Sequence, residues 1–259
     1  MFVDLLAHVG EYTISLCRSL GRFSLFFVQA VKTLCGTKLK VAKTIEQMSQ
    51  IGVDSFPIVF LTGSFAGMVF ALQTYVGFQR VGGEQYIGAV VALGMIRELG
   101  PVLTGLMVIG RAGSAIAAEI GTMKITEQID ALSTLRINAL QYLVIPRMIA
   151  STFILPFLTL FAMALGIVGG YIVCVYVIGL NAEDYETSIR TFVELSDIRG
   201  GLIKALFFGL LFSWVSTYKG FYTSGGARGV GIATTQAVVA GSVLVLAANY
   251  FITKLLEQL

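Results

Sequence analysis

Charged residues are scarce in this sequence. Asp, Glu, Lys and Arg make up 13% of its 259 residues, whereas a soluble domain has about 25%. The mean hydropathy is +0.83, and a 27.8 kDa chain of this kind has too few polar side chains to coat a soluble globule. The composition therefore excludes a soluble enzyme and predicts an integral membrane protein.

Histidine and cysteine are also rare, which removes several kinds of chemistry. A single histidine, His8, excludes a metal site built from several histidines. The cysteines, Cys17, Cys35 and Cys174, form no C-x-x-C pair, so we interpret them as reduced thiols that serve as small apolar side chains. The net charge of +3 is too small to predict nucleic-acid binding.

Glycine, by contrast, is abundant, with 29 residues. Small residues spaced four apart recur in the apolar runs, and such pairs let membrane helices approach closely. We interpret them as contacts between helices of one chain. The pairs are Gly63/Gly67, Gly113/Ala117, Gly166/Gly170 and Ala237/Gly241.

Runs without charge locate the membrane spans. The runs 55–79, 148–182 and 229–253 contain no Asp, Glu, Lys or Arg, and each can cross a bilayer as a helix. The stretches 85–118 and 200–218 are apolar but contain charges. Together they give five predicted spans in an all-α membrane protein.

The distribution of basic residues predicts the orientation. With a cytoplasmic N-terminus, the segments 1–54, 111–147 and 219–228 face the cytoplasm and hold most of the 18 basic residues. The acidic segment 181–199 then faces outward, in agreement with the positive-inside rule, and the C-terminus lies outside. We divide the chain into an N-terminal part, 1–54, and a five-span domain formed by the remaining residues to 259.

The first 35 residues form a different kind of helix. Polar side chains recur every three or four positions, with one gap filled by Phe26, and apolar residues fill the other side. This pattern predicts an amphipathic helix in the membrane interface, the alternative being a helix packed on a soluble partner. Lys38, Lys40 and Lys43 follow as a basic connector suited to anionic headgroups.

Two charges lie inside the second predicted span. A charge at membrane depth costs about 2.5–3.5 kcal/mol on insertion scales and indicates function. Arg97 and Glu98 are neighbours on a helix, so we expect them to have different partners. Pro101 cannot donate to the carbonyl of Arg97, and Gly100 weakens the same turn, which predicts a broken helix. The alternative is that both charges only snorkel to the outer headgroup region.

A short amphipathic helix is predicted at about 121–136, between the second and third spans. Apolar residues at i, i+4 and i+7 from Ile125 share one face, whereas Glu127 and Asp130 are acidic and exposed. Such a helix suits a soluble partner. The alternative, a helix resting on the membrane, would favour Lys and Arg at the acidic positions.

Five sequence blocks together resemble the MlaE family of ABC-transporter permeases, which work in lipid transport with MCE-domain proteins. The blocks are GMVFALQ at 67–73, RELGP at 97–101, GRAGSAIAAEIGTMKITEQIDAL at 110–132, VIPR at 144–147 and GVGIATTQAVV at 229–239. The resemblance covers essentially the whole chain, and its weakest parts are 80–95 and 181–197.

The resemblance implies a homodimer of five-span subunits, each with an N-terminal interfacial helix. It also implies a cytoplasmic ABC ATPase, a STAS-domain accessory protein, a periplasmic MCE-domain hexamer and a phospholipid held in an outward-facing cavity. The lipid-site candidates are then Phe70, Gln73, Thr74, Gly77, Arg97 and Glu98. The segment 121–136 becomes the coupling helix, and the candidates for ATPase contact are Glu119, Gly121, Thr122, Thr126, Glu127, Gln128 and Asp130.

No G-x-x-x-x-G-K-[ST] loop occurs in the sequence, and GGARGVG at 225–231 lacks the required lysine. We therefore expect a non-catalytic subunit without a cofactor, with ATP bound and hydrolysed by a separate polypeptide. The predicted location is the inner membrane of a Gram-negative bacterium, and the predicted role is phospholipid transport that supports outer-membrane lipid asymmetry. The alternative is a stand-alone secondary carrier or channel that uses Arg97 and Glu98 as an ion site. An intramembrane hydrolase is disfavoured because no G-x-S motif is present.

Overall fold

The computed structural model describes residues 2–37, 39–80, 82–256 and 258, with the side chains of 2–9, 12, 15 and 16 outside the described set. His8 and Lys38 thus lie outside the described side chains. Within the described residues the chain is helical with short connections and has no strand. In the described part of the chain, five helices are long and apolar enough to span a membrane: Val41–Phe78, Glu84–Ile125, Leu140–Val177, Leu195–Phe221 and Gly226–Leu256. This confirms the all-α membrane fold and the five predicted spans, including the two that carry charges.

Several spans consist of more than one helical piece. Wide π-helical turns at Met95–Leu99 and Ile109–Gly113 divide the second span into α3, α4 and α5, and similar turns flank α7 at Leu140–Val144 and Ile172–Val177. The α-helices are α1 (Phe2–Gly36), α2 (Val41–Phe78), α3 (Ile87–Gly94), α4 (Gly100–Val108), α5 (Ser114–Ile125), α6 (Gln128–Thr134), α7 (Ile145–Tyr171), α8 (Ala182–Phe192), α9 (Leu195–Phe221) and α10 (Gly226–Leu256).

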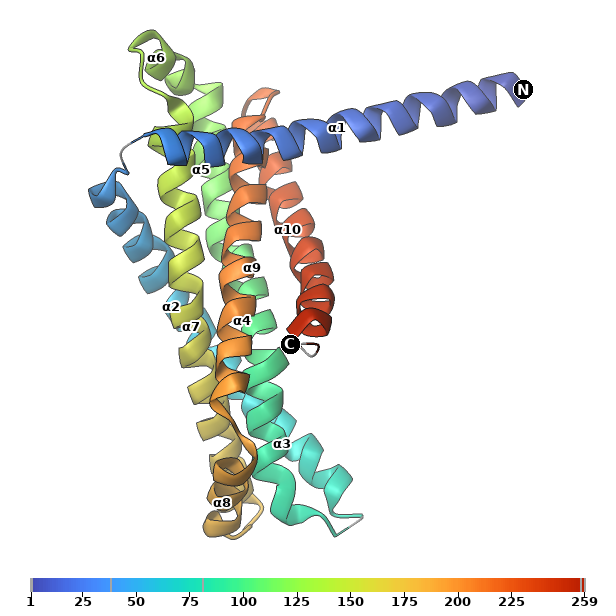
Figure 1. Ribbon diagram of the computed structural model, residues 1–259, viewed down its shortest axis with the longest axis vertical. Helices are drawn as coiled ribbons and strands as arrows, with labels where there is room; N and C mark the ends of the chain where they lie inside the picture. The colour runs from blue at the N-terminus through green and yellow to red at the C-terminus, as the bar shows by residue number, and fades with distance from the viewer. Residues whose placement is uncertain (1, 38, 81, 257, 259) are drawn as a thin grey trace.

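The spans run side by side along the long axis of the molecule (Figure 1). Helix α1 lies across one end of the bundle, almost at right angles to it, and α6 projects at the same end. Helix α8 lies at the opposite end, and α10 ends part-way along the bundle. The chain thus places the N-terminal helix and the loop between the second and third spans on one side, as an even number of crossings requires.

Helices α2 and α7 touch through glycine. A Cβ atom added to Gly67 would overlap the backbone of Gly166, and one added to Gly63 would lie 3.0 Å from the Cα of Ala162. Backbones this close leave no room for a side chain, so glycine is required at the crossing. The small-residue pairs in these two helices therefore serve packing within the chain, as predicted.

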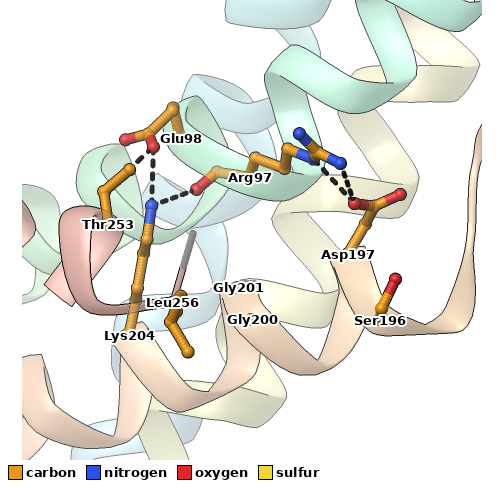
Figure 2. Close-up of a pocket in the computed structure, with 9 residues that line it drawn as sticks. All are labelled: Arg97, Glu98, Ser196, Asp197, Gly200, Gly201, Lys204, Thr253 and Leu256. Atoms are coloured by element: carbon orange, nitrogen blue, oxygen red, sulfur yellow. Dashed lines mark hydrogen bonds and ion pairs between the residues drawn. The ribbon is translucent and has the colours of Figure 1, made fainter. Parts of the chain in front are cut away.

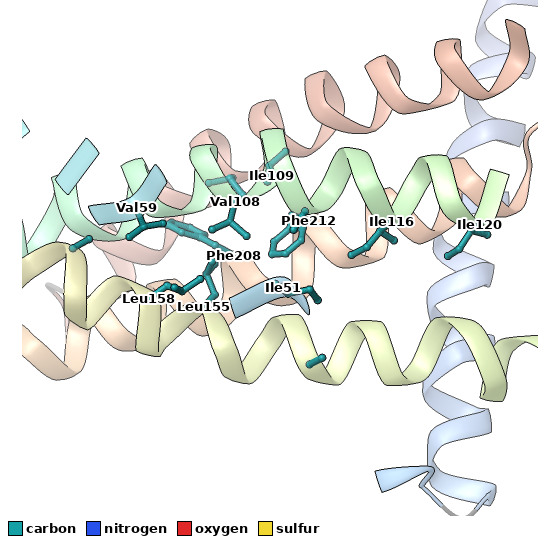
Figure 3. Packing of buried hydrophobic residues seen from close by; sticks show 14 of the residues in the cluster. Ile51, Val59, Val108, Ile109, Ile116, Ile120, Leu155, Leu158, Phe208 and Phe212 are labelled. Carbon is teal, nitrogen blue, oxygen red and sulfur yellow. The ribbon is translucent and has the colours of Figure 1, made fainter. Parts of the chain in front are cut away.

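The main apolar core is centred on α9. Phe208 and Phe212 are fully buried, and side chains from α2, α4, α5 and α7 surround them (Figure 3). Val108, Ile116 and Leu155 are among these neighbours. Because one helix contacts most of the others, α9 fixes the positions of the second and last spans relative to each other.

Helix α1 is anchored by aromatic side chains. Phe23 stacks on Trp214 of α9 with ring centroids 4.0 Å apart, and Phe26 packs against Tyr218 and Phe221. Phe26 is 1% exposed, so the residue that interrupts the polar stripe is, together with Phe23, an anchor of α1 on the bundle. The orientation of α1 across the spans is that of a helix in the membrane interface.

The predicted basic connector is partly engaged within the chain. The Nζ atoms of Lys40 and Lys43 lie 4.3 and 3.2 Å from the ring centroid of Tyr142. These cation–π contacts join the start of α2 to the start of the third span. The two lysines therefore serve a structural contact in addition to any attraction to headgroups.

The helix predicted at about 121–136 is two helices in the structure. Helix α5 continues to Ile125, and α6 begins only at Gln128, after Glu127 in a left-handed conformation with φ of 59°. Ile129 is buried and Leu132 packs beside it on the core, whereas Ile125 belongs to the preceding helix. The spacing of apolar residues could not reveal this turn, because one left-handed residue reverses the chain without changing the pattern.

The predicted outer segment 181–199 also contains a helix. Asn181 caps α8 by accepting the backbone N–H of Glu183, and Tyr185 is buried with its hydroxyl donating to the carbonyl of Ile167 at 3.2 Å. Ser188 accepts the N–H of Ala89 at 3.1 Å. Helix α8 is thus packed on the ends of the second and third spans.

Candidate functional site: a charged pocket at three spans

A pocket of about 290 Å³ opens where the second span meets the start of α9 and the end of α10 (Figure 2). Its polar groups come from three separate spans. Gly200 and Gly201 at the start of α9 lie in its wall, and a Cβ atom added to Gly201 would overlap the carbonyl oxygen of Ile96, so this glycine lets α9 approach the second span closely. The lining residues are Arg97, Glu98, Ser196, Asp197, Gly200, Gly201, Lys204, Thr253 and Leu256.

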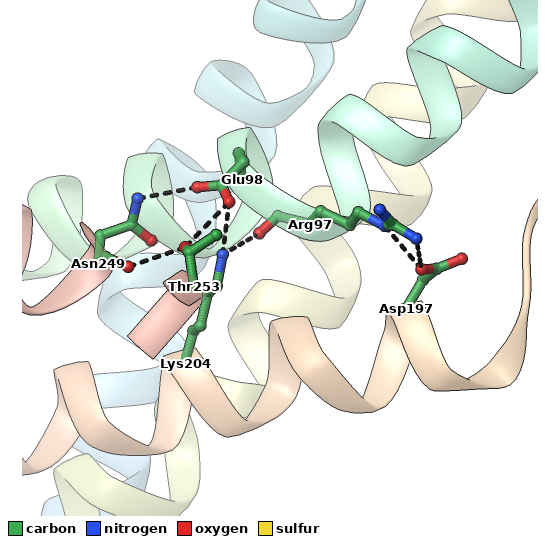
Figure 4. A network of polar contacts seen from close by, with 6 residues as sticks. All are labelled: Arg97, Glu98, Asp197, Lys204, Asn249 and Thr253. Atoms are coloured by element: carbon green, nitrogen blue, oxygen red, sulfur yellow. Dashed lines mark hydrogen bonds and ion pairs between the residues drawn. The ribbon is translucent and has the colours of Figure 1, made fainter. Parts of the chain in front are cut away.

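Glu98 is the centre of the hydrogen-bond network (Figure 4). Lys204 donates from Nζ to Oε1 at 2.6 Å, and Thr253 donates to the same oxygen at 3.1 Å. Asn249 donates from Nδ2 to Oε2 at 2.8 Å. Both carboxylate oxygens are therefore satisfied by donors from α9 and α10, so that Glu98 ties three spans together.

Arg97 is held by a different partner. Its Nε donates to Oδ1 of Asp197 at 2.6 Å, and Asp197 Oδ2 accepts the backbone N–H of Glu194 at 2.9 Å. Glu194 and Asp197 form a capping box at the N-terminus of α9. Arg97 is thus anchored on a helix cap, and the prediction that Arg97 and Glu98 have different partners is confirmed.

Lys204 also compensates for the proline that follows this pair. Pro101 has no N–H for the carbonyl of Arg97, and Lys204 donates to that carbonyl at 2.7 Å. The chain stays helical through Pro101, after a π-helical turn over Met95–Leu99. The predicted broken helix is therefore a widened turn, because a lysine from α9 supplies the missing hydrogen bond.

Burial within the pocket is uneven. The side chains of Lys204 and Asp197 are each 4% exposed, whereas Arg97 is 58% exposed and Glu98 is 41% exposed. Each buried charge thus holds one accessible charge of opposite sign. The pocket can offer a cation and an anion, fixed in place, to the polar end of an amphipathic ligand.

Sequence reasoning did not identify the partners of these two charges. The signals were present: Lys204 is the only charge within 200–218, and Asn249 and Thr253 are polar residues in the last apolar run. Asp197 stood among several acidic residues of the outer segment. Only the packing of α9 and α10 against the second span brings the four side chains together.

The four lipid-site candidates on the first span are not among the described residues that line this pocket. Phe70 is partly buried beside Gly94, and Thr74 is buried and donates to the carbonyl of Phe70 at 2.7 Å. Gln73 and Gly77 are exposed on α2. Their assignment to lipid stays a prediction that concerns a different face of the molecule.

The candidates for ATPase contact lie mostly on the projecting end formed by α5 and α6. The exposed members are Glu119, Thr122, Thr126, Glu127, Gln128 and Asp130. Asp130 accepts from Lys124 at 3.0 Å, which ties α6 to α5 across the turn. Gly121 is buried against Thr223. An ATPase could therefore contact Gly121 only if the loop before α10 moved away.

Glu119 has a partner within the chain. Its Oε1 lies 2.7 Å from Nη2 of Arg147, a residue whose side chain is 5% exposed at the start of α7. Arg147 also donates from Nη1 to the carbonyl of Leu143 at 2.8 Å. This ion pair joins the two helices that flank α6, so the projecting loop is attached to the bundle on both sides.

Comparison with known proteins agrees with this architecture. Residues 44–255 match the family model described as Permease MlaE. A probable ABC transporter permease protein of Rickettsia bellii is 46% identical over 255 residues, which cover 98% of both chains. The Haemophilus influenzae protein named intermembrane phospholipid transport system permease protein MlaE is 35% identical over 99% of this chain and 98% of its own length.

A plant protein is also similar. The chloroplastic protein TRIGALACTOSYLDIACYLGLYCEROL 1 of Arabidopsis thaliana is 37% identical over 230 residues, which cover 89% of this chain and 66% of the plant protein. The family match reaches from the first membrane span to the last and includes the charged residues of the pocket, Arg97, Glu98, Asp197 and Lys204. The chain therefore belongs to the MlaE family of ABC-transporter permeases.

Proposed function

We propose that this chain is the membrane-spanning subunit of an ATP-driven transporter that moves phospholipid between the inner membrane of a Gram-negative bacterium and a periplasmic MCE-domain hexamer. Its role is to support the lipid asymmetry of the outer membrane. In this proposal the permease is a homodimer with cytoplasmic N-termini and periplasmic C-termini. A cytoplasmic ABC ATPase, together with a STAS-domain protein, supplies the energy.

The charged pocket carries the proposal. Accessible Arg97 and Glu98, held by buried Asp197 and Lys204, stand at the edge of an otherwise apolar bundle. A phospholipid combines a charged headgroup with apolar chains. The fixed charges of the pocket suit the headgroup, and the apolar surface beside them suits the chains. The similarity to a phospholipid-transport permease supports this choice of ligand.

Lipid capture tests the pocket. A photoreactive residue at position 98 should crosslink phospholipid in the intact complex, and the same residue at positions 70, 73 and 74 tests the first span. Capture at position 98 is expected to exceed capture at an exposed apolar control such as Val243, which does not line the pocket. Equal capture at 98 and 243 would show ordinary contact with the bilayer and would refute the site.

The projecting end supports the ATPase contact. Glu127 is exposed on the turn between α5 and α6, away from the membrane-spanning surfaces. Glu127→Lys reverses its charge and should weaken copurification of the ATPase and lower coupled lipid transport. Glu186→Lys on α8, at the other end of the bundle, is the matched control and should leave ATPase binding unchanged.

Two outcomes would contradict the coupling assignment. One is undiminished ATPase binding with Glu127→Lys, and the other is an equal loss with both variants. Transport by the isolated permease in liposomes under an ion gradient would instead support a secondary carrier. The purified permease without its partner should show no ATPase activity.

A further inference from the structure

A second cavity lies at the other end of the bundle, beneath α1 and between α9 and α10. Its volume is about 610 Å³, against about 290 Å³ for the pocket at Glu98. Helix α1 contributes Arg22 and Phe23, and α9 contributes Val215 and Lys219. This cavity shares no lining residue with the charged pocket, so it is a separate candidate site.

One part of the cavity is cationic. Arg22 and Lys219 both line it, and no acidic residue is among its described lining residues. Lys219 donates to Oε1 of Gln236 at 3.0 Å, which holds its ammonium group toward α10 and leaves two further N–H donors. Arginine and lysine side chains that line one cavity, with no carboxylate among its described lining residues, favour an anionic ligand.

A groove continues along α10, with polar lining residues near Lys219, among them Gln236 and Thr223, and apolar lining residues, Ala240 and Leu244, further along the helix. The lining residues of α10 lie on one face from Gly229 to Leu244, a rise of about 22 Å at 1.5 Å per residue. Val215 of α9 forms part of the opposite wall, and Ala240 leaves space between the two helices. The hydrocarbon core of a bilayer is about 30 Å thick, so a groove of this length reaches through one leaflet.

The position of α1 relates the two parts to the membrane. Arg22 lies on the helix that crosses the end of the bundle, whereas Leu244 lies further along a membrane span. Cations are therefore at the interface, and the groove runs from them into the hydrocarbon core. An acyl chain with an anionic headgroup at its end has this distribution of charge.

We infer that this cavity binds an anionic glycerophospholipid of the leaflet that faces α1, with its phosphate at Arg22 and Lys219 and one acyl chain along Val215, Ala240 and Leu244. The inference rests on the placement of the chain in a membrane and does not require ATP-driven transport. It adds a lipid site on the α1 side to the one proposed at Glu98. A lipid held there would contact α1, α9 and α10 together.

Photolabelling of the full-length permease in detergent micelles tests the inference. The probe is phosphatidylglycerol with a diazirine in the middle of one acyl chain, and phosphatidylcholine with the same chain is the zwitterionic comparison. Labelled peptides are expected from α9 and α10 around positions 215 and 240–244. Unlabelled phosphatidylglycerol should compete, whereas inorganic phosphate should not.

Two matched substitutions separate a site from general lipid contact. Ala240→Trp fills the groove and should remove most of the labelling, whereas Val239→Trp places the same ring on the adjacent exposed position and should leave labelling unchanged. Arg22→Gln and Lys219→Gln should each lower phosphatidylglycerol binding by about fivefold, with little effect on phosphatidylcholine. Lys32→Gln, on the same helix but outside the cavity, should have no effect.

Several results would overturn the inference. They are equal loss of labelling with Trp at 239 and 240, equal labelling by both lipids, competition by inorganic phosphate, and a disulfide between two chains that carry Ala240→Cys. The last result would show that a second copy of the permease covers the groove. Since this assay contains no ATPase, a negative result leaves the proposed transport function to be judged by its own experiments.

Discussion

Two buried charged residues, Lys204 and Asp197, each make two structural contacts. Lys204 neutralises Glu98 and also replaces the donor that Pro101 removes from the second span. Asp197 caps α9 and also binds Arg97. Burying a charge in a membrane protein costs free energy because the charge loses its water. When one buried charge makes two contacts, that desolvation penalty arises only once.

The Glu119–Arg147 pair gives a prediction at this scale, because its two members are buried to different extents. Glu119→Gln leaves the 5%-exposed Arg147 without its counterion, and we expect a loss of about 3 kcal/mol, as for other broken buried pairs. Arg147→Met leaves a carboxylate that is 55% exposed and can be hydrated, so we expect a loss of only about 1 kcal/mol. Unfolding of the purified protein in detergent measures both.

The double variant provides the control for that pair. Glu119→Gln with Arg147→Met removes both charges and should be more stable than Glu119→Gln alone. If Arg147→Met destabilises the protein more than Glu119→Gln does, the buried cation is not the costly member and the interpretation is wrong.

At the scale of elements, runs without charge identified every span, but they did not indicate where the helices change course. The second span passes through two π-helical turns, and the loop that follows it reverses at left-handed Glu127. These features depend on neighbours: Lys204 stabilises the first, and packing of Ile129 on the core favours the second. A helix that looks continuous in sequence is therefore divided by tertiary contacts.

A buried tyrosine of helix α8 predicts how the stability of the protein depends on pH. Burial of Tyr185, with a smaller effect of Cys174, raises the pKa of its phenol well above the usual value of about 10. Because the folded state keeps the proton that the unfolded state loses, this contribution to stability is complete below pH 10 and is lost as the pH rises above it. The free energy of unfolding should fall by about 1.4 kcal/mol per pH unit from this group.

Tyr185→Phe tests this assignment by difference. The variant cannot ionise at this position, so its free energy of unfolding should fall less steeply with pH above 10 than that of the protein without the substitution. Equal slopes for the protein and Tyr185→Phe would show that Tyr185 does not titrate from a buried position.

At the scale of the whole molecule, α1 and α6 share one end of the bundle and α8 occupies the other (Figure 1). The charged pocket and the cavity beneath α1 are therefore at different depths along the spans. The second span connects the projecting loop to the charged pocket through α5, the π-helical turn Ile109–Gly113 and α4, and the other π-helical turn, Met95–Leu99, carries the pocket residues Arg97 and Glu98.

The three natural cysteines test this orientation without further substitution. Cys17 and Cys35 are exposed on α1, and Cys174 is buried near the opposite end. A membrane-impermeant maleimide should modify Cys17 and Cys35 in inside-out vesicles but not in right-side-out vesicles, and should leave Cys174 unmodified in both. Modification of α1 from the outer face would place the N-terminus in the periplasm and refute the proposed topology.

From the sequence alone we could predict that this is a membrane protein, how many spans it has, that an amphipathic helix precedes them, and to which family it belongs. These depend on composition, on runs without charge and on local motifs, all of which are properties of neighbouring residues. The packing of the spans was needed to find the partners of Arg97 and Glu98, the ion pair of Glu119 and the cavity beneath α1. Each of these joins residues far apart in the chain, for example Glu98 and Thr253. Helical periodicity states which residues share a face, but only the packing of the spans decides which faces meet.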